Sequence, residues 1–511
     1  MQKFLISGLF IFMNSSILFA QNTFQNILKN GAKADGKTLN TKIIQKAIDE
    51  TNQKGGGTIY FPAGTYLTGK IHLKSNITLF IEAGATLLFS DNFDDYLPMV
   101  QSRWEGTDVV NFSPLIYAWE AENITITGRG KLDGQGKKWW DYHHWLYSQP
   151  EDFKSDWQKT FAENNKEVIM PDQPEMITRG FCRPPFFQPM HCKNVRVEGI
   201  TITNSPFWTI NPEYCENVTV DGVTINNPES PNTDGINPES CKYVHISNCH
   251  ISVGDDCITI KSGKDRSGRK SAAPCENITI TNCTMLRGHG GVVIGSEMSG
   301  GVKKVSISNC VFEGTDRGIR IKSTRGRGGV VEDIRVSNII MKDIRMEAIK
   351  LNMFYSKTEY EPVSERTPSF RNIHFSGITG NAKQAGFLLG LEEMKIQNIS
   401  FSDIYIDAEI GFTVKDAEDI TFNNAVVCAS TSPSLTINDS KYIDINSFSS
   451  SNPQADIPVI RLNNASQINI HNCYQSRQTA VFVQKNKTNC SNIFIGNNEL
   501  SNVNNVLTEM E

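Results

Sequence analysis

Four short segments carry the residues whose types could do chemistry together. They are Asn232-Thr233-Asp234, Gly254-Asp255-Asp256, Gly288-His289-Gly290 and Arg320-Ile321-Lys322. Three neighbouring carboxyl groups cannot all ionise cheaply, so one of them should keep a proton at mildly acidic pH. A protonated acid beside an ionised base is the pair of groups needed to hydrolyse a glycosidic bond. The two cations indicate an acidic substrate, because Arg can bind a carboxylate through two hydrogen bonds.

A recurring phrase predicts the elements that position these segments. Its form is x-Asn/Asp-Ile/Val-x-Ile/Val, and from residue 194 onward its occurrences lie 21 to 39 residues apart. A period of this size is typical of a solenoid. Apolar and polar residues alternate within the phrase, as in Val218-Thr219-Val220, which indicates β-strands. Because no long helical pattern intervenes, the predicted fold class is all-β, a right-handed parallel β-helix.

The repeat places the four segments on neighbouring coils. Asp255 and His289 each lie 12 residues after a phrase position, Tyr243 and Asn277. Equivalent positions on stacked coils lie about 4.8 Å apart, so these two side chains should be neighbours. Successive side chains on an ideal strand point to opposite faces, so the chain must bend if Asp255 and Asp256 are to act together. Gly254 makes such a bend possible.

The ends and the longest interruption of the repeat are of another type. A helix is predicted over residues 40–52, with Asn40 as its cap and with Ile44, Ala47 and Ile48 on one face. It would cover the open N-terminal end of the solenoid. Residues 132–190 form an insertion that holds Trp139, Trp140, Tyr142, Trp145, Tyr147 and Trp157. The insertion is either a folded loop with a small core of its own or a wall of the cleft whose aromatic faces pack against sugar rings.

Nine of the twelve cysteines follow the repeat. They form two sets, Cys192, Cys215, Cys241, Cys275 and Cys490, and Cys249, Cys283, Cys310 and Cys473. Each set should stack in a ladder, and buried free thiols are favoured over disulfides there. The spacing follows the coils and contains no C-x-x-C pair, so a zinc site is not expected, and no cofactor is predicted.

The N-terminal residues and the charge pattern bear on location and partners. Residues 1–20 have the features of a secretory signal, with Lys3 before an apolar run and Ala20 before Gln21, so a secreted or periplasmic protein is expected. Residues 21–511 are then predicted to form a single domain with no membrane span. The net charge of -5 argues against nucleic acid as a partner. Residues 255–327 nevertheless hold thirteen Lys or Arg and seven Asp or Glu, a local positive field that suits an anionic substrate.

In this order and spacing, the four segments resemble the signature of the polygalacturonases, the family 28 glycoside hydrolases. The resemblance covers about residues 30 to 430 and includes residues 31–36, 60–66 and 204–208 and the triplet Arg183-Pro184-Pro185. It implies an inverting hydrolase of α-1,4-linked galacturonate in pectin. The resemblance further implies that Asp255 is the general acid, that Asp234 and Asp256 hold and activate the water, and that His289 tunes Asp255. It also implies that Arg320 and Lys322 bind a galacturonate carboxylate and that Tyr355 contacts the substrate.

The resemblance leaves several alternatives open. The 132–190 insertion and the long tail after residue 430 could close one end of the cleft, which favours exo action. A hydrolase of rhamnogalacturonan or of a substituted pectin is a second interpretation. A pectate lyase, which would use calcium and a basic residue, and a non-catalytic polysaccharide-binding β-helix are two more. The sequence leaves the oligomeric state open.

Overall fold

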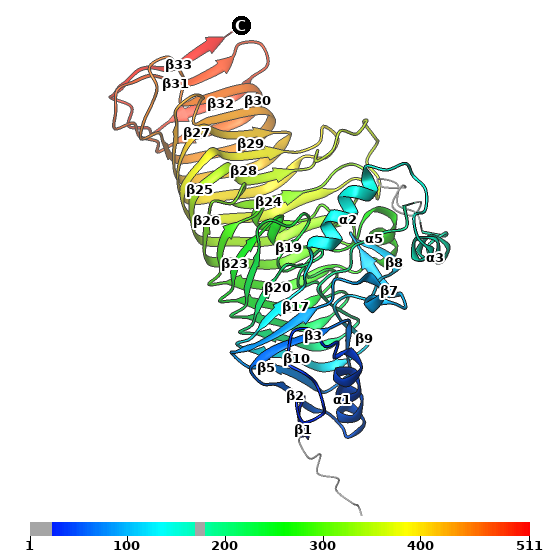
Figure 1. The fold of residues 1–511 in the computed structure, drawn as a ribbon. Helices are drawn as coiled ribbons and strands as arrows, with labels where there is room; N and C mark the ends of the chain where they lie inside the picture. The colour runs from blue at the N-terminus through cyan, green and yellow to red at the C-terminus, as the bar shows by residue number, and fades with distance from the viewer. Residues whose placement is uncertain (1–22, 169–178, 511) are drawn as a thin grey trace, which may run out of the picture.

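The computed structural model describes residues 23–168 and 179–510, so the predicted signal at residues 1–20 lies outside the described part. Strands stack coil upon coil into an elongated solenoid (Figure 1). All pairings within the solenoid are parallel, and only the hairpin of β7 (Val100–Trp104) and β8 (Thr107–Asn111) is antiparallel. The predicted right-handed parallel β-helix is therefore confirmed. Within the described residues, no helix is long and apolar enough to cross a membrane.

Each coil of the first half contributes strands to three faces. The first face contains β1 (Thr23–Asn26), β2 (Gly57–Phe61), β5 (Ile77–Ile81), β10 (Glu122–Gly128), β13 (Lys193–Glu198), β15 (Glu216–Asp221), β17 (Lys242–Ser247) and β20 (Cys275–Thr281). The second face contains β3 (Gly64–Thr68), β6 (Ala85–Phe89), β11 (Lys131–Asp133), β14 (Thr201–Thr203), β16 (Thr224–Asn227), β18 (His250–Val253) and β21 (Thr284–Arg287). The third face contains β4 (Ile71–Leu73), β9 (Ile116–Trp119), β12 (Phe187–Met190), β19 (Asp256–Ile260), β22 (Gly290–Ile294) and β24 (Ile319–Lys322).

The later strands are mostly longer and run across more than one face. They are β23 (Val302–Glu313), β25 (Val330–Asn352), β26 (Ser369–Leu389), β27 (Ile396–Lys415), β28 (Ala417–Ala429), β29 (Leu435–Ser449), β30 (Ile460–His471), β31 (Thr479–Asn486), β32 (Ser491–Gly496) and β33 (Val503–Met510).

The recurring phrase marks one corner of every coil. Its first polar position has a left-handed backbone in all fourteen occurrences, with φ near +60°, as at Asn194 (56°) and Asn217 (58°). Asn adopts this conformation more readily than most residues, which explains its frequency there. The amides also pair along the axis: Asn194 Nδ2 donates to Asn123 Oδ1 at 2.8 Å, and Asn217 Nδ2 to Asn194 Oδ1 at 3.1 Å.

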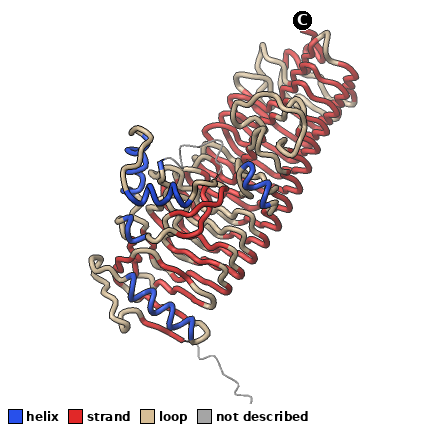
Figure 2. The backbone as a smooth tube through the Cα atoms, turned by 90° about the vertical axis from the view of Figure 1, so that its right-hand side faces the viewer, coloured by secondary structure: helices blue, strands red, loops and turns tan. Residues whose placement is uncertain are grey.

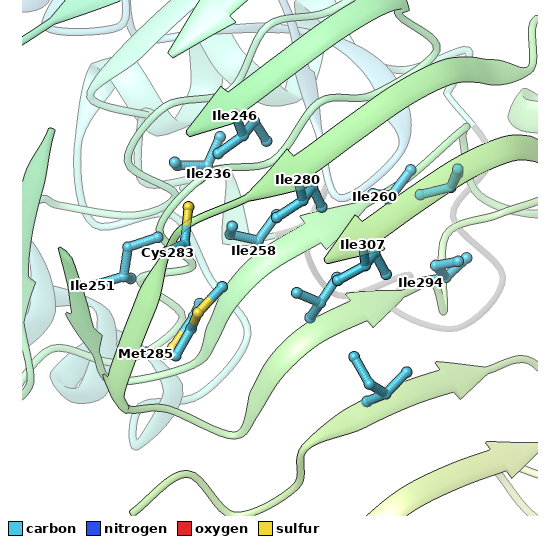
Figure 3. Packing of buried hydrophobic residues seen from close by; sticks show 14 of the residues in the cluster. Ile236, Ile246, Ile251, Ile258, Ile260, Ile280, Cys283, Met285, Ile294 and Ile307 are labelled. Atoms are coloured by element: carbon cyan, nitrogen blue, oxygen red, sulfur yellow. The ribbon is translucent and has the colours of Figure 1, made fainter. Parts of the chain in front are cut away.

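Apolar rows fill the interior of the solenoid (Figure 3). On the third face Ile236 pairs with Ile258, and Ile258 with Val292, so their side chains stack coil on coil and all three are buried. Each buried side chain of this size contributes about 1.5–3 kcal/mol. The rows therefore fix the register of the strands, and with it the position of every polar side chain on the outside.

The cysteines take part in these rows as thiols. Cys215, Cys241 and Cys275 are buried and unbridged, and the backbone N–H of Cys215 donates to Cys241 Sγ at 3.4 Å. Cys241 contacts Cys275 in the same way at 3.4 Å. These thiols behave as small apolar side chains with a weak hydrogen bond.

A helix lies at the N-terminal end of the solenoid. Helix α1 (Thr41–Gln53) buries Ile44, Ala47 and Ile48 and contacts β1, β2, β4 and β5 (Figure 1). The expected capping by Asn40 is wrong in detail, because its side chain makes no cap bond. The Asn40 amide instead binds the backbone N–H and carbonyl of Lys33, which ties the preceding loop to the helix.

The remaining elements gather beside the third face (Figures 1 and 2). They are the 3-10 turn η1 (Phe93–Tyr96), the hairpin β7–β8, and the helices α2 (Lys137–Tyr147), α3 (Asp156–Asn164) and α5 (Asp265–Ser271). Trp139 of α2 is fully buried, and its ring centre lies 4.2 Å from that of Phe93 and 5.4 Å from that of Phe112. Trp139 therefore joins the insertion to the apolar interior of the solenoid, so the expected separate core of the insertion is not what the structure shows.

Candidate active site

A cavity of about 610 Å³ opens on the third face. It is lined by Glu105, Trp208, Asn232, Asp234, Asp255, Asp256, Lys261, Lys264, His289, Ser296, Glu297, Arg320, Lys322, Arg327, Tyr355 and Ser356. The structure thus brings all seven residues selected from the sequence to one cavity, although they come from five successive coils.

Strand register accounts for this convergence. Asp256 pairs with Gly290, which places Asp255 beside His289 as the 12-residue offsets predicted. Gly254 and Asp255 form the bend between β18 and β19 that lets both aspartates line the cavity. A Cβ at position 254 would lie 1.8 Å from the carbonyl oxygen of Ser230. Glycine is needed at this bend because there is no space for a side chain.

Asp255 and His289 form a hydrogen-bonded pair at the mouth of the cavity. His289 Nδ1 lies 3.0 Å from Asp255 Oδ1, and the backbone N–H of His289 donates to the Asp255 carbonyl at 2.8 Å. Burial acts to raise the pKa of Asp255, but the hydrogen bond from His289 and the charge of Lys322 outweigh burial and lower it. The same hydrogen bond raises the pKa of His289. The ligand-free pair therefore favours a carboxylate beside an imidazolium.

Asp234 lies deeper, with 2% of its surface exposed. Its Oδ2 accepts hydrogen bonds from Asn237 Nδ2 at 2.7 Å and Thr259 Oγ1 at 3.0 Å, and Lys261 Nζ is 3.7 Å away. Burial, followed by the charge of Asp255, raises the pKa of Asp234 to about 8. The raised pKa of Asp234 and the lowered pKa of Asp255 therefore favour Asp234 over Asp255 as the carboxyl that keeps a proton in the ligand-free protein.

The two cations selected from the sequence differ in their partners. Lys322 Nζ is 2.9 Å from Asp256 Oδ2, and both residues are buried. Arg320 is also nine-tenths buried, yet it pairs with no carboxylate among residues 23–168 and 179–510. Its guanidinium carbon lies 5.4 Å from the ring centre of Tyr355, which is 45% exposed. Arg320 therefore presents an uncompensated positive charge to the cavity.

Among the described residues, five charged side chains that line the cavity were not selected by the sequence analysis: Glu105, Lys261, Lys264, Glu297 and Arg327. Lys261 Nζ lies 2.7 Å from Glu297 Oε2 and 4.4 Å from the ring centre of Trp208. Burial acts to raise the pKa of Glu297, but Lys261 and other cations lower it further, so the pair is ionised. A signal was available in the repeat: Ile258-Thr259-Ile260-Lys261 matches Ile319-Arg320-Ile321-Lys322.

Arg183, which the sequence analysis named only as part of the Arg183-Pro184-Pro185 triplet, supports the Asn232 loop. Arg183 is almost fully buried, and its Nη2 donates to Asn232 Oδ1 at 2.8 Å. Its Nη1 donates to the carbonyl of Pro231 at 2.7 Å. Asn232 Nδ2 in turn is 3.4 Å from Asp255 Oδ2. The Arg183-Pro184-Pro185 triplet therefore acts from behind the cavity by fixing this loop.

The residues that bound the cavity are not those expected from the sequence, which were the 132–190 insertion and the tail after residue 430. Among residues 23–168 and 179–510, no lining residue comes from the 132–190 insertion or from the tail after residue 430. The aromatic residues of the insertion pack together, with Tyr142 and Trp157 centred 5.5 Å apart, so the interpretation as an aromatic wall of the cleft is wrong for this cavity. The boundary is formed instead by Trp208 and by Glu105 at the tip of the β7–β8 hairpin.

Known proteins share both the sequence pattern and the fold. The family model described as "Glycosyl hydrolases family 28" matches residues 177–421, and "Rhamnogalacturonase A/epimerase, pectate lyase-like" matches residues 24–155. A probable polygalacturonase of Vitis vinifera is 31% identical over 420 residues, which cover 79% of each chain. An endo-polygalacturonase of Pectobacterium carotovorum subsp. carotovorum is 29% identical over 75% of this chain and 88% of its own.

A solved structure extends the similarity to three dimensions. The hyperthermoactive exopolygalacturonase from Thermotoga maritima matches with a TM-score of 0.68 and 34% identity, over 79% of this chain and 91% of that chain. The first model above spans the four segments that carry the carboxyls, the imidazole and the cations of the cavity. The chain therefore belongs to the glycosyl hydrolases of family 28.

Proposed function

We propose that this protein hydrolyses α-1,4-galacturonosidic bonds in pectin by an inverting acid/base mechanism, releasing galacturonate from a chain end. The observation that carries the proposal is the buried Arg320, which pairs with no carboxylate in the described part of the chain and lines a cavity that also holds three aspartates. A buried cation without a counter-charge is costly, and a uronate carboxylate would supply that charge in a bidentate pair. The exposed ring of Tyr355 offers an apolar face beside it.

The reaction divides among the three carboxyls. Asp255 gives a proton to the departing glycosidic oxygen as the bond to the anomeric carbon breaks. Asp234 and Asp256 hold a water, which attacks the same carbon from the opposite face and loses a proton to one of them. Two carboxylates that share one water leave room for attack without a covalent intermediate, so inversion is expected.

The proton must change its position when substrate binds, because the ligand-free protein holds it on Asp234. A sugar over Asp255 excludes water, and a uronate carboxylate nearby adds negative charge; both effects raise the pKa of a carboxyl group. His289 can release its proton to Asp255 across their 3.0 Å contact. Once Asp255 is neutral, the charge that helped to raise the pKa of Asp234 is gone, and Asp234 can release its own proton to solvent. Substrate binding then favours a protonated Asp255 and an ionised Asp234, which is the state that hydrolysis needs.

The shape of the cavity supports exo action. Relatives with endo and exo activity are both similar to the chain, so their names do not decide the mode. The cavity stops at Trp208 and Glu105 on its N-terminal side, and the third face of earlier coils lies beneath the β7–β8 hairpin. A polymer chain that cannot continue past this boundary must place an end there.

Two rivals make different demands on the site. A lyase needs a base that removes the C5 proton and, usually, calcium; three aspartates with an Asp255–His289 pair suit proton donation to a leaving group better. A hydrolase of rhamnogalacturonan remains the second candidate, because a family model of that type matches residues 24–155. The cation pair favours a uronate at the site, which such mixed polymers also contain.

The test is a product profile over time on polygalacturonate, on rhamnogalacturonan and on fully methyl-esterified pectin. We expect saturated galacturonate from polygalacturonate at the first time point and little release from the ester, which lacks the carboxylates. An ultraviolet-absorbing product that disappears with a chelator would show a lyase, and faster release from rhamnogalacturonan would move the substrate to that polymer. We further propose export, on the features of residues 1–20; cell fractionation of the full-length chain tests it.

A further inference from the structure

A row of charged side chains runs along the third face and changes sign at the boundary of the cavity. Glu213 pairs with Glu239 and Glu239 with Lys261 on successive coils, so the three occupy equivalent positions. Strand pairing of Ile260 with Ile294 and of Ile294 with Ile321 continues the row to Lys322. Lys261 and Lys322 line the cavity, whereas the two glutamates lie outside it and are fully buried.

One residue of the hairpin covers the glutamates. Arg103 of β7 is fully buried, and its Nε lies 2.8 Å from Glu239 Oε1 and 3.8 Å from Glu213 Oε2. The other face of the guanidinium contacts the Tyr214 ring, with 4.7 Å from its carbon to the ring centre. Asp108 of β8 approaches Nη1 at 3.6 Å from the outer side. The guanidinium thus lies between the hairpin and the face of the solenoid.

The main chain around Arg103 is attached to the same face. Its carbonyl accepts a hydrogen bond from Gln188 Nε2 at 3.0 Å, and the hydroxyl of Ser102 donates to Gln188 Oε1 at 2.7 Å. At the tip of the hairpin, the backbone N–H of Lys264 donates to the Gly106 carbonyl at 2.9 Å. The hairpin is therefore held beside its tip by Arg103 and Gln188 and at the tip itself by the loop before α5.

We propose that Arg103 is the positioning residue that closes the cleft on this side, by locking the β7–β8 hairpin over Glu213 and Glu239. The inference rests on the proposed action on an acidic polymer. With the hairpin in place, a chain has no path beyond Glu105. Without it, a polyanion would meet two carboxylates where the cavity offers cations, so sterics and charge act together. Arg103 does not contact the cavity and would set the cleavage mode rather than the rate of the chemical step.

The test removes the ion pairs of Arg103 with Glu213 and Glu239 without leaving one of these charges buried and unpaired. The triple variant Arg103→Gln, Glu213→Gln, Glu239→Gln removes one cation and two acids together, and amides can still pair with one another. On polygalacturonate, we expect wild type to release monomer alone and the triple variant to release oligomers at the earliest times, with a faster fall in viscosity per bond cleaved. Hydrolysis of digalacturonate, which is too short to need a path beyond the hairpin, should keep its kcat/KM.

A matched control separates the lock from a general charge effect. Arg196→Gln removes an exposed arginine that pairs with Glu198 on the first face, and its products should equal those of wild type. A folded triple variant that still releases only monomer overturns the role of Arg103. Oligomers from wild type itself would overturn the exo mode and the lock together, while hydrolysis would stand; absence of any hydrolysis would instead refute the proposed function.

A second variant decides the matter if the triple variant does not fold. Gly106 has φ of +78°, and a Cβ there would lie 2.6 Å from the backbone nitrogen of Lys264. Gly106→Ala should therefore separate the tip of the hairpin from this loop and leave Arg103 intact. We expect early oligomers from this variant as well, in a smaller share. Products identical to those of wild type would contradict closure by the hairpin.

Discussion

Replacement of Asp255 tests the assignment of the general acid, which matters because the pKa of Asp234 is raised in the ligand-free protein and that of Asp255 is lowered. Asp255→Asn conserves the shape of the side chain, whose contacts are His289 Nδ1 at 3.0 Å and Asn232 Nδ2 at 3.4 Å, so the fold should be unaffected. Loss of a general acid typically costs about 10²–10⁴-fold, or roughly 3–5 kcal/mol of barrier. We expect a loss of this size in kcat on polygalacturonate.

The leaving group decides between Asp255 and Asp234. In a nitrophenyl galacturonide the leaving group is a nitrophenolate, which departs without being protonated. Asp255→Asn should therefore recover most of its activity on this substrate. Asp234→Asn should remain impaired on both substrates, because water activation is still needed. The measurement is kcat on both substrates over a range of pH.

The reasoning fails in a recognisable way. If Asp255→Asn loses equally on both substrates while Asp234→Asn recovers on the nitrophenyl glycoside, Asp234 is the acid, and its raised pKa serves proton donation to the leaving group. Asp221→Asn is the control: this aspartate accepts hydrogen bonds from Ser247 and Asn248 away from the cavity, and its replacement should leave both activities unchanged.

Three more predictions concern binding and stability. Arg320→Gln removes a charged hydrogen-bonding group of about 1.5–3 kcal/mol, so kcat/KM on polygalacturonate should fall about 10- to 150-fold; an equal loss on the methyl ester would contradict carboxylate binding. Lys322→Met leaves the buried Asp256 without its cation, and chemical denaturation should show a cost of about 3–5 kcal/mol, largely restored by adding Asp256→Asn. The pKa of Asp234 is raised to about 8 in the native state, whereas an unfolded Asp loses its proton above about pH 4. Between these two pH values the native state binds one proton more than the unfolded state. The free energy of unfolding of the wild type should therefore fall as pH rises from about 4 to about 8. Asp234→Asn lacks this penalty, so its Tm should gain on wild type from pH 4 to pH 8; a constant difference would show that the pKa is not raised.

Much of the fold was predictable because the repeat controls it. A single corner with a left-handed backbone recurs at Asn194, Asn217 and twelve other phrase positions, and the residue after it points into the core. The strand register followed from counting residues from each phrase position. Asp255 and His289 have the same count and were therefore predicted as neighbours. The bend at Gly254 was predicted as well, but its cause, the Ser230 carbonyl on the preceding coil, is a contact that only the folded chain reveals.

The boundaries of the site were not predictable in this way. Arg103 lies in a hairpin outside the repeat, so no count of phrase positions relates it to Glu239. The raised pKa of Asp234 depends on burial and then on the charge of Asp255, and spacing does not describe how deeply a side chain is buried. Lys261 is the exception. It occupies the same position in its coil as Lys322, so the repeat could have predicted it as a residue of the cavity.

The stacked coils determine the order in which parts of the protein lose structure on heating. Each coil contacts only its neighbours, so a stack of this kind loses structure from its ends inward. The side chains of β33 at one end are largely exposed, whereas the coils from Asn232 to Ser356 lie in the interior of the stack. Hydrogen exchange should therefore begin in the last coils while hydrolysis continues, and the temperature at which activity is lost should exceed the temperature at which the first amides become unprotected.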